Sequence, residues 1–361
     1  MPSIVKTLLV GGGLVLVALV IDIALPQVMP DSSIRQLLML AAVNVIIALS
    51  LNIINGMAGQ FSIGHAGFVG VGAYTAGVVA SNIHKIWPGE VTLGRSFVIV
   101  PVAVISGSIL AALFGFLVGL PSLRLKGDYL AIVTLGFSEM FRLLIATAPA
   151  GSNQTGLAGL LGKLGGVNGY MGTDDQGIPL YAGPFWILGA VMFAVLVSWR
   201  LKFSGWGRAL RALREDEVAA SAVGIDPTRF KVTSFVLAAA GAGMAGSLMS
   251  TMRDGSGAAQ PDTFTFQLSF DAITMVILGG SGSISGSMLG ALFVTFTVKA
   301  IELLQALESV QAFRQSTGID LNALRMVVYA AVLILVMIMR PEGLFGEREA
   351  LGLDRRKATA A

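Results

Sequence analysis

Long apolar segments, each of about 20 residues, follow one another along most of this chain, and a helix of that length crosses the hydrocarbon core of a bilayer. Charged residues make up 12% of the sequence, against roughly 25% in a soluble domain. The pattern predicts an all-α, polytopic transmembrane bundle that forms a single domain over residues 1–361. The clear segments lie near residues 8–25, 36–54, 60–83, 97–120, 129–148, 183–199, 232–251 and 323–339.

The interval 264–304 is longer than a single crossing requires and is interrupted by the sequence GGSGSISG at 279–286. We predict two helices there, which gives a total of about ten spans. A re-entrant hairpin at this place would leave the orientation of the later chain unchanged, so both arrangements stay open. The first apolar run lacks a small-x-small cleavage site before Pro26, so we expect a transmembrane helix there and not a signal peptide.

Charge is densest between residues 200 and 231, and basic residues near span ends mark the cytoplasmic side. If 200–231 is cytoplasmic, then Lys6, the loop with Arg124 and the basic tail after residue 340 are cytoplasmic as well. We therefore expect both chain termini in the cytoplasm and an external loop at 149–182. The net charge of +3 reflects this topology and contact with membrane lipid, and does not indicate nucleic-acid binding.

The expected external loop at 149–182 is rich in glycine and polar residues. Loops of this length are often functional, so a docking surface for an external partner and a simple surface loop are equally good interpretations.

Several kinds of chemistry are excluded by the sequence. There is no cysteine, and the residues after Gly162-Lys163 do not complete a phosphate-binding loop. The pattern G-x-G-x-x-G at 241–246 lies inside an apolar span, where it indicates a small-residue face for close helix packing and not a dinucleotide site. We therefore expect no cofactor and no metal in this chain.

Polar and ionisable residues inside apolar spans are costly unless they are paired or functional. Glu139 and Arg142 stand three residues apart on one helix face, and they indicate equally well a structural ion pair or a lining of the transport path. Asp271 and the pair Lys299 and Glu302 are weaker cases of the same kind. His65 more plausibly bonds a neighbouring helix than serves as a base, since no carboxylate or second histidine stands at ligand spacing.

A short pattern, Gly-x-x-Ser-Ile, occurs at 59–63 and again at 280–284. Paired interruptions of spans point to binding sites in some transporters. The serines of the two patterns and the ionisable residues together give a candidate translocation path. It comprises Ser62, His65, Glu139, Arg142, Asp271 and Ser283.

The segment 200–231 itself predicts helix, turn and helix. Trp206, Leu210 and Leu213 fall on one face of an amphipathic helix. Asp216 is a suitable N-cap for a second short helix, Gly224 suits a left-handed residue after it, and Asp226-Pro227 start the next span.

Five stretches of the chain are distinctive enough to compare with known families. They are GQFSIGHAGFVGVGAYTAG at 59–77, RLKGDYLAIVTLGFSEMFRLL at 124–144, GRALRALREDEVAASAVGID at 207–226, FDAITMVILGGSGSISGSMLGALF at 270–293 and RPEGLFG at 340–346. In this order they resemble the LivM-type permease of branched-chain amino acid ABC importers. Within them, residues 217–224 resemble the "EAA…G" coupling motif of importer permeases. Residues 150–182 match that family only loosely.

The resemblance implies a transport subunit, not an enzyme, in the inner membrane of a bacterium or archaeon. It implies four kinds of partner: a homologous second permease, two cytoplasmic ATPases that bind ATP and Mg²⁺, an external substrate-binding protein, and lipid. The ATPase-coupling residues that it implies are Arg211, Glu215, Asp216, Glu217, Ala219, Ala220 and Gly224. Alternatives are the same architecture carrying urea, other amino acids or small amides, and an ion-coupled secondary transporter.

Overall fold

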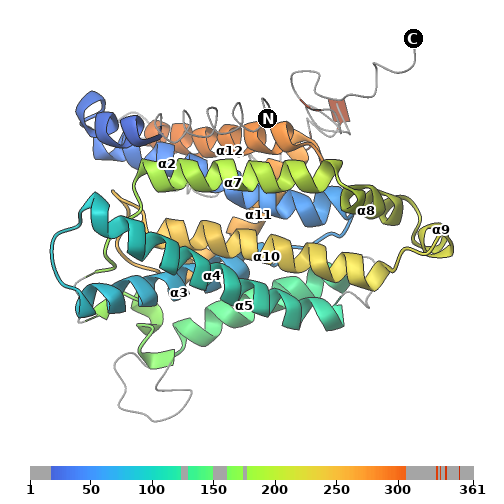
Figure 1. Ribbon diagram of the computed structural model, residues 1–361, viewed down its shortest axis with the longest axis horizontal. Helices are drawn as coiled ribbons and strands as arrows, with labels where there is room; N and C mark the ends of the chain where they lie inside the picture. Colours follow the sequence, from blue (N-terminus) through green and yellow to red (C-terminus); the bar gives the residue numbers. More distant parts are fainter. Residues whose placement is uncertain are drawn as a thin grey trace, which may run out of the picture.

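The structure, a computed structural model, describes residues 18–122, 129–148, 161–173 and 177–305 and the single positions 331, 334, 338, 339 and 349. It is a bundle of helices that run roughly alongside one another (Figure 1). In this described part, seven helices are long and apolar enough to cross a membrane. They are α2 (Ser32–Asn52, extended by the π-helical turn η1, Ile53–Met57), α3 (His65–Ile86), α4 (Leu93–Ser122), α5 (Tyr129–Ala146), α7 (Pro184–Phe203), α10 (Pro227–Thr251) and α12 (Ile284–Gln305).

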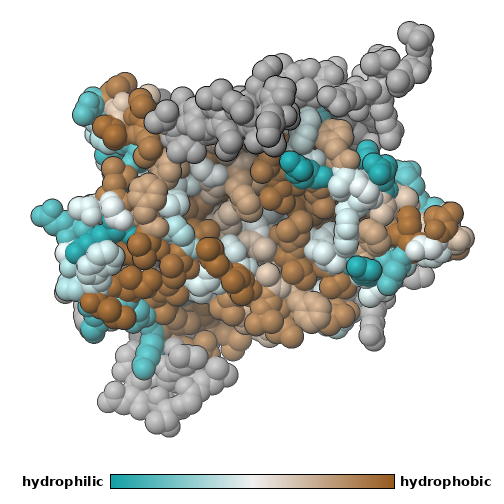
Figure 2. All heavy atoms as spheres, viewed as in Figure 1, coloured by the Kyte–Doolittle hydropathy of each residue, from teal (hydrophilic) through white to brown (hydrophobic). Residues whose placement is uncertain are grey.

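The polytopic all-α prediction is confirmed for these helices. Figure 2 shows apolar residues across the middle of the bundle and hydrophilic ones gathered toward its two ends, as expected of a protein that spans a bilayer. The first predicted span is described only from Ala18, as a short helix to Val28. The span predicted at 323–339 lies outside the described residues apart from single positions.

The interval 264–304 forms the two predicted helices, separated by residues 280–283, but the first is shorter than a full crossing requires. Helix α12 is long enough to cross, but α11 (Phe266–Gly279) has only 14 residues. At 1.5 Å per residue it spans about 21 Å, less than the roughly 30 Å of a hydrocarbon core. Its start lies beside the middle of α5, where the Glu139 carboxylate accepts a hydrogen bond from the Phe266 N–H at 3.0 Å. The Glu139 carboxylate thus caps the first turn of α11, and the 3₁₀ turn Pro261–Phe264 precedes that helix.

Helix α10 occupies the centre of the bundle and packs on α2, α3 and α4. The predicted small-residue face at 241–246 is confirmed in this place. A Cβ atom on Gly246 would lie 1.9 Å from the Val69 carbonyl oxygen on α3, and one on Gly72 would lie 2.2 Å from the Gly243 carbonyl oxygen. Such close backbone approach is how helices associate without a hydrophobic driving force between them.

Two loops meet at the bundle end remote from α8 and α9. The described part of 149–182 pairs with the loop after α10: the Tyr170 and Ala259 backbones exchange hydrogen bonds of 2.9 and 3.0 Å. The buried Tyr181 hydroxyl also bonds His84 Nδ1 at 2.8 Å. These described residues are therefore packed against the bundle, while docking of an external partner on this loop stays a prediction.

Candidate functional site

The segment predicted as helix, turn and helix forms α8 (Gly205–Glu215) and α9 (Glu217–Ala222), here named the α8–α9 unit. It lies at one end of the bundle, with α9 at the tip (Figure 1). The apolar face of α8 is buried through Leu210 and Leu213, and Trp206 contacts Phe230 of α10 in a tilted arrangement with ring centroids 4.3 Å apart. The unit is therefore fixed to the transmembrane helices α7 and α10 on both sides.

The caps of α9 are those that the sequence predicted. The Asp216 side chain accepts hydrogen bonds from the N–H groups of Val218 and Ala219 at 2.8 and 3.0 Å. Gly224 has a φ of 86°, the left-handed conformation that glycine adopts most easily. The Asp226 side chain then caps α10. These caps stabilise a two-turn helix, which would be too short to be stable without them.

The surface of α9 differs from the expected set of coupling residues. Ala220 is only 4% exposed, so it packs inward and supports the unit from within. Val218 and Val223 are 81% and 76% exposed, and they put a small apolar patch on the tip. The predicted ATPase contact of Ala220 stays a prediction, and the two valines that flank it in sequence face outward.

The other residues expected to couple differ in position. Glu217 lies on the surface in an ion pair with Lys231 at 2.7 Å, and Ala219 and Glu215 are exposed. Arg211 is half-buried and donates to the Gly207 carbonyl oxygen at 3.3 Å, so it braces the start of α8.

Arg214, at the end of α8, connects the α8–α9 unit to the transmembrane helices. Its guanidinium donates to the Gly56 carbonyl oxygen in η1 at 2.8 Å. A Cβ atom on Gly59 would lie 2.5 Å from the Arg214 Cγ, and one on Gly282 would lie 3.6 Å from an Arg214 nitrogen. One side chain therefore contacts two non-helical segments that are far apart in sequence.

These two segments are 58–64 before α3 and 280–283 before α12, here named the paired breaks. The first contains the Gly-x-x-Ser-Ile pattern at 59–63, and the second contains the pattern at 280–284 except for its last residue, which begins α12. Asn52 bonds the second: its Oδ1 accepts from the Gly282 N–H at 2.8 Å and its Nδ2 donates to the Ser283 carbonyl oxygen at 3.2 Å. Buried backbone outside helices needs such partners within the protein. The weak sequence similarity thus corresponds to two neighbouring interruptions.

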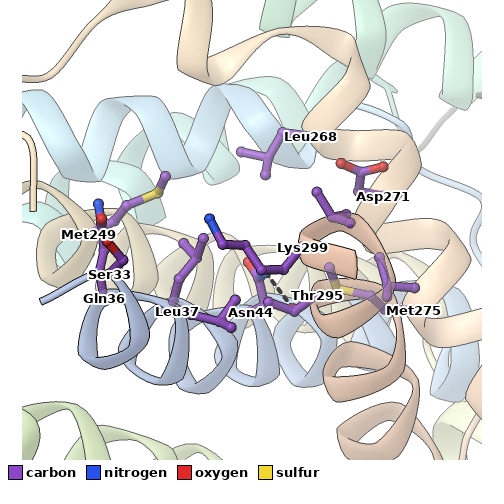
Figure 3. A pocket seen from close by; sticks show the side chains of 13 residues that line it. Ser33, Gln36, Leu37, Asn44, Met249, Leu268, Asp271, Met275, Thr295 and Lys299 are labelled. Atoms are coloured by element: carbon purple, nitrogen blue, oxygen red, sulfur yellow. Dashed lines mark hydrogen bonds between the residues drawn. The ribbon is translucent and has the colours of Figure 1, made fainter. Parts of the chain in front are cut away.

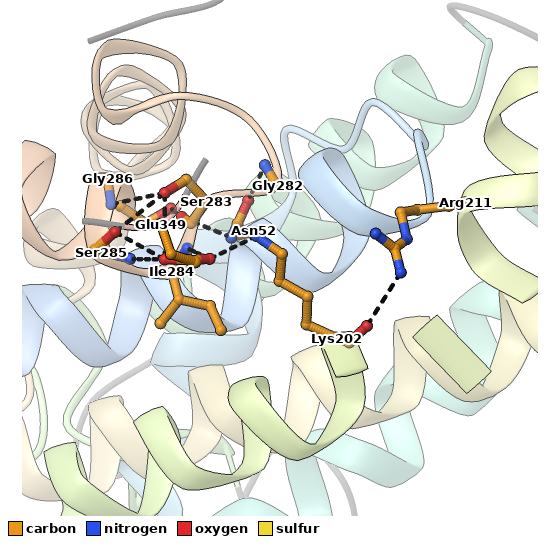
Figure 4. Close-up of polar contacts among 10 residues, drawn as sticks. Asn52, Lys202, Arg211, Gly282, Ser283, Ile284, Ser285, Gly286 and Glu349 are labelled. Carbon is orange, nitrogen blue, oxygen red and sulfur yellow. Dashed lines mark hydrogen bonds and ion pairs between the residues drawn. The ribbon is translucent and has the colours of Figure 1, made fainter. Parts of the chain in front are cut away.

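Glu349 binds the N-terminus of α12 (Figure 4). Its carboxylate accepts hydrogen bonds from the N–H groups of Ile284 and Ser285, both at 3.0 Å, and from the Ser285 hydroxyl at 2.7 Å. It also forms an ion pair with Lys202 at the end of α7, and its side chain is 2% exposed. A carboxylate at a helix N-terminus is stabilised by the helix dipole and by unpaired N–H groups.

The Glu349 carboxylate is held in its charged form. Burial raises the pKa of this group, but the Ile284 N–H, the Lys202 ammonium and Ser285 together lower it, and the net pKa lies below the usual value of 4.5. No local pattern predicts this contact, because Glu349 stands 65 residues after its partner Ile284.

The residues of the predicted translocation path do not form one cluster. Ser62 and Ser283 belong to the paired breaks. His65 begins α3 and its Nε2 bonds the Ser50 hydroxyl on α2 at 2.8 Å, as expected for a histidine that contacts a neighbouring helix. Glu139 and Arg142 form an ion pair at 2.8 Å beside the start of α11, where Glu139 acts as a cap.

Asp271 alone among the predicted path residues lines the cavity of Figure 3. This cavity of about 360 Å³ lies between α2, α10, α11 and α12. Its polar lining includes Asn44, which bonds Thr295 at 2.8 Å, and Lys299. The remaining wall is mainly aliphatic or thioether: Leu37, Leu40, Met249, Leu268, Met275, Val294 and Val298.

Comparison with known proteins places this architecture in a family. A family model described as the permease component of the branched-chain amino acid transport system matches residues 33–337. The chain belongs to this family. The permease match includes the described spans from α2 to α12, the α8–α9 unit and the paired breaks.

Individual permease proteins resemble the chain over most of its length. The high-affinity branched-chain amino acid permease protein LivM of Salmonella typhimurium is 33% identical, over 90% of this chain and 73% of the relative. LivH of Escherichia coli is 25% identical, over 86% and 93%. The ribose import permease RbsC of Haemophilus influenzae is 29% identical, over 80% and 84%. No solved structure matches the chain.

Proposed function

We propose that this chain is the membrane permease subunit of an ABC importer that carries branched-chain amino acids, with the α8–α9 unit as the site where an ATPase subunit docks. The permease family supports the first part. The second rests on one observation: a short, firmly capped helix presents two exposed valines beyond the end of the bundle. Two exposed valines at the tip of an otherwise hydrophilic end of the bundle are suited to contact an apolar groove on another protein.

The proposed assembly contains a second, homologous permease, two ATPases and an external binding protein, in the inner membrane with both termini of this chain in the cytoplasm. The second permease is supported by the similarity of the chain to both LivM and LivH, which are separate permease proteins. ATP and Mg²⁺ would bind to the ATPases, and this chain would carry no cofactor. The α8–α9 end would face the cytoplasm.

In this proposal, movement of the ATPases displaces the α8–α9 unit, and Arg214 transmits the displacement to the paired breaks. Non-helical segments change direction more easily than continuous helices, because they have fewer backbone hydrogen bonds to lose. The contacts of Arg214 with Gly56 and of Asn52 with Gly282 therefore join docking to the spans that would open.

The test is uptake of labelled L-leucine into proteoliposomes. The full assembly is expected to import leucine only with ATP, and the purified chain alone is expected to import none. Import by the chain alone, driven by an ion gradient, would establish the secondary-transporter alternative. ATP-driven import of ribose or urea in place of leucine would agree with an ABC importer but would show that the proposed substrate is wrong.

A further inference from the structure

Helix α5 and the turn before α11 carry charged side chains on the outside of the bundle. The Arg142 guanidinium pairs with Glu139 at 2.8 Å and lies 3.7 Å from the carboxylate of Asp262, a residue of the turn Pro261–Phe264. The Asp262 side chain is 81% exposed in spite of this contact, and Glu139 and Arg142 are partly exposed. These three residues, here named the α5 charge cluster, therefore form part of the surface of the chain.

The α5 charge cluster lies at the level of the bundle centre. Helix α4 has 30 residues and a length of about 45 Å, so its middle, at Gly107, lies near the midplane of a bilayer. A Cβ atom on Gly107 would lie 2.9 Å from the carbonyl oxygen of Gly72 on α3. One helical turn or less away, a Cβ atom on Gly70 would lie 2.9 Å from the Phe141 ring and 3.3 Å from Phe264. These two phenylalanines stand within two residues of the cluster in sequence, so the cluster is near the midplane as well.

Charged groups at this depth are not expected to face lipid. Ionisable side chains in membrane-spanning regions almost always face protein or a water-filled cavity, because a charge in hydrocarbon is costly. The contact with Arg142 leaves most of the Asp262 carboxylate uncovered. Beside it, Met140, Phe266 and Phe270 are exposed, and a mixture of aromatic, methionine and arginine side chains is typical of protein interfaces. This surface is therefore suited to contact with another protein.

We infer that the surface formed by α5 and the start of α11 binds the second permease, and that Asp262 pairs there with a lysine or arginine of that subunit. This inference rests on the proposed function, which supplies the second permease, and adds to it the place where the two permeases meet. Among the proposed protein partners only the second permease spans the membrane. The ATPases and the binding protein lie outside it, so they do not reach a surface at the bundle centre.

The charge of the cluster favours a different permease over a second copy of this chain. Two carboxylates and one guanidinium leave one excess negative charge. In a pair of identical chains, a twofold axis through this surface would bring the two excess negative charges close together. A different permease with a basic residue opposite Asp262 would avoid that repulsion and would form a charge-assisted hydrogen bond.

Site-specific photocrosslinking in membranes that contain the whole assembly tests the inference. The photoreactive amino acid p-benzoylphenylalanine replaces Met140 or Phe270 on the proposed interface, or the similarly exposed Ile109 on α4 or Leu196 on α7. Irradiation should join this chain to the second permease from Met140 and Phe270, and not from Ile109 or Leu196. Crosslinks to the second permease from α4 or α7 alone, or crosslinks between two copies of this chain from Met140, would overturn the inference.

Reversal of the exposed charge tests the pairing of Asp262. Asp262→Lys should lower the amount of second permease that co-purifies with this chain by about tenfold or more, because like charges would then face each other. Asp262→Asn, which keeps the shape of the side chain, should lower it less. Glu90→Lys makes the same charge change in the exposed loop between α3 and α4 and should retain the second permease. Equal retention by Asp262→Lys and wild type would overturn the pairing.

The proposed function is judged separately, by ATP-driven leucine uptake with the wild-type assembly. Leucine uptake without a crosslink from Met140 or Phe270 to the second permease would refute this inference alone. Crosslinks from both positions in an assembly that does not import leucine would support the interface and refute the proposed substrate.

Discussion

Arg214 is the residue through which the proposed docking unit contacts both paired breaks from the end of α8. We predict that Arg214→Ala lowers leucine uptake by about tenfold at an unchanged rate of ATP hydrolysis, within the usual range of coupling energies between sites. Uptake and hydrolysis should be measured on the same proteoliposomes.

The matched control is Arg208→Ala. Arg208 is an exposed arginine on the same helix, and its loss should leave the ratio of uptake to hydrolysis unchanged. Equal effects of the two substitutions would show that α8 needs only positive charge. The contact of Arg214 with Gly56 would then play no part in coupling ATP hydrolysis to transport.

The buried Glu349 carboxylate is expected to stabilise the fold. Replacing Glu349 with Gln removes a charge that Lys202 and two backbone N–H groups bind, so we expect a loss of about 1–3 kcal/mol in the free energy of unfolding at pH 7. Glu217→Gln, in a pair that is more exposed, should cost well under 1 kcal/mol. Thermal unfolding in detergent measures both.

The pH dependence follows from the lowered pKa of Glu349. A carboxylate with a folded-state pKa below its unfolded value of 4.5 stabilises the fold above that value. Its contribution is lost as the pH falls from about 4.5 through the lowered pKa. The difference between wild type and Glu349→Gln should therefore be full at neutral pH and shrink below about pH 4.5, and a constant difference down to pH 3 would contradict this assignment.

At the scale of helices, glycine contacts fix how closely the spans approach. Gly246→Ala puts a methyl group 1.9 Å from the Val69 carbonyl oxygen, so α3 and α10 must separate. We expect a loss of about 1–3 kcal/mol in unfolding free energy, as for other overpacked sites. Gly189→Ala on α7, whose Cβ would meet open space, should be neutral or slightly stabilising. Equal melting temperatures for the two variants would show that the contact between α3 and α10 accommodates a methyl group at position 246.

Periodicity and caps were enough to predict most elements. The seven long spans, the α8–α9 unit and its capping residues Asp216, Gly224 and Asp226 follow from local sequence. The late start of α3 at His65 and the short α11 do not, because residues 60–64 fall within the predicted span 60–83 and residues 264–265 fall within the interval predicted as two crossings. Their backbone is non-helical because neighbours such as Glu139, Asn55 and Thr134 provide its hydrogen bonds, and those contacts are long-range or set by the fold.

The same distinction separates the site residues. Asp271 and the capped surface helix α9 could be predicted from the local sequence. Asp271 is a charged residue in an apolar span, and α9 is bounded by typical capping residues. Arg214, Asn52 and Glu349 carry no local signal. Each acts through a partner more than 60 residues away, and a single sequence does not contain that pairing.

For the whole molecule, the account makes one end of the bundle an ATPase-docking surface and the middle a path for an amino acid. The cavity, the α11–α12 hairpin, the paired breaks and the α8–α9 unit form a continuous series of contacts from α2 to α9. Force applied at α9 would therefore reach the turn before α12 through packed groups and hydrogen bonds.

The most direct test of this account is retention of the ATPase during purification of the assembly from detergent. Wild type and Val91→Glu, which alters an exposed valine between α3 and α4, should both retain the ATPase. The double variant Val218→Glu and Val223→Glu, which charges the exposed tip of α9, should lose it while keeping the second permease. An ATPase retained equally by all three proteins, or by none of them, would contradict the claim that α9 is the docking site.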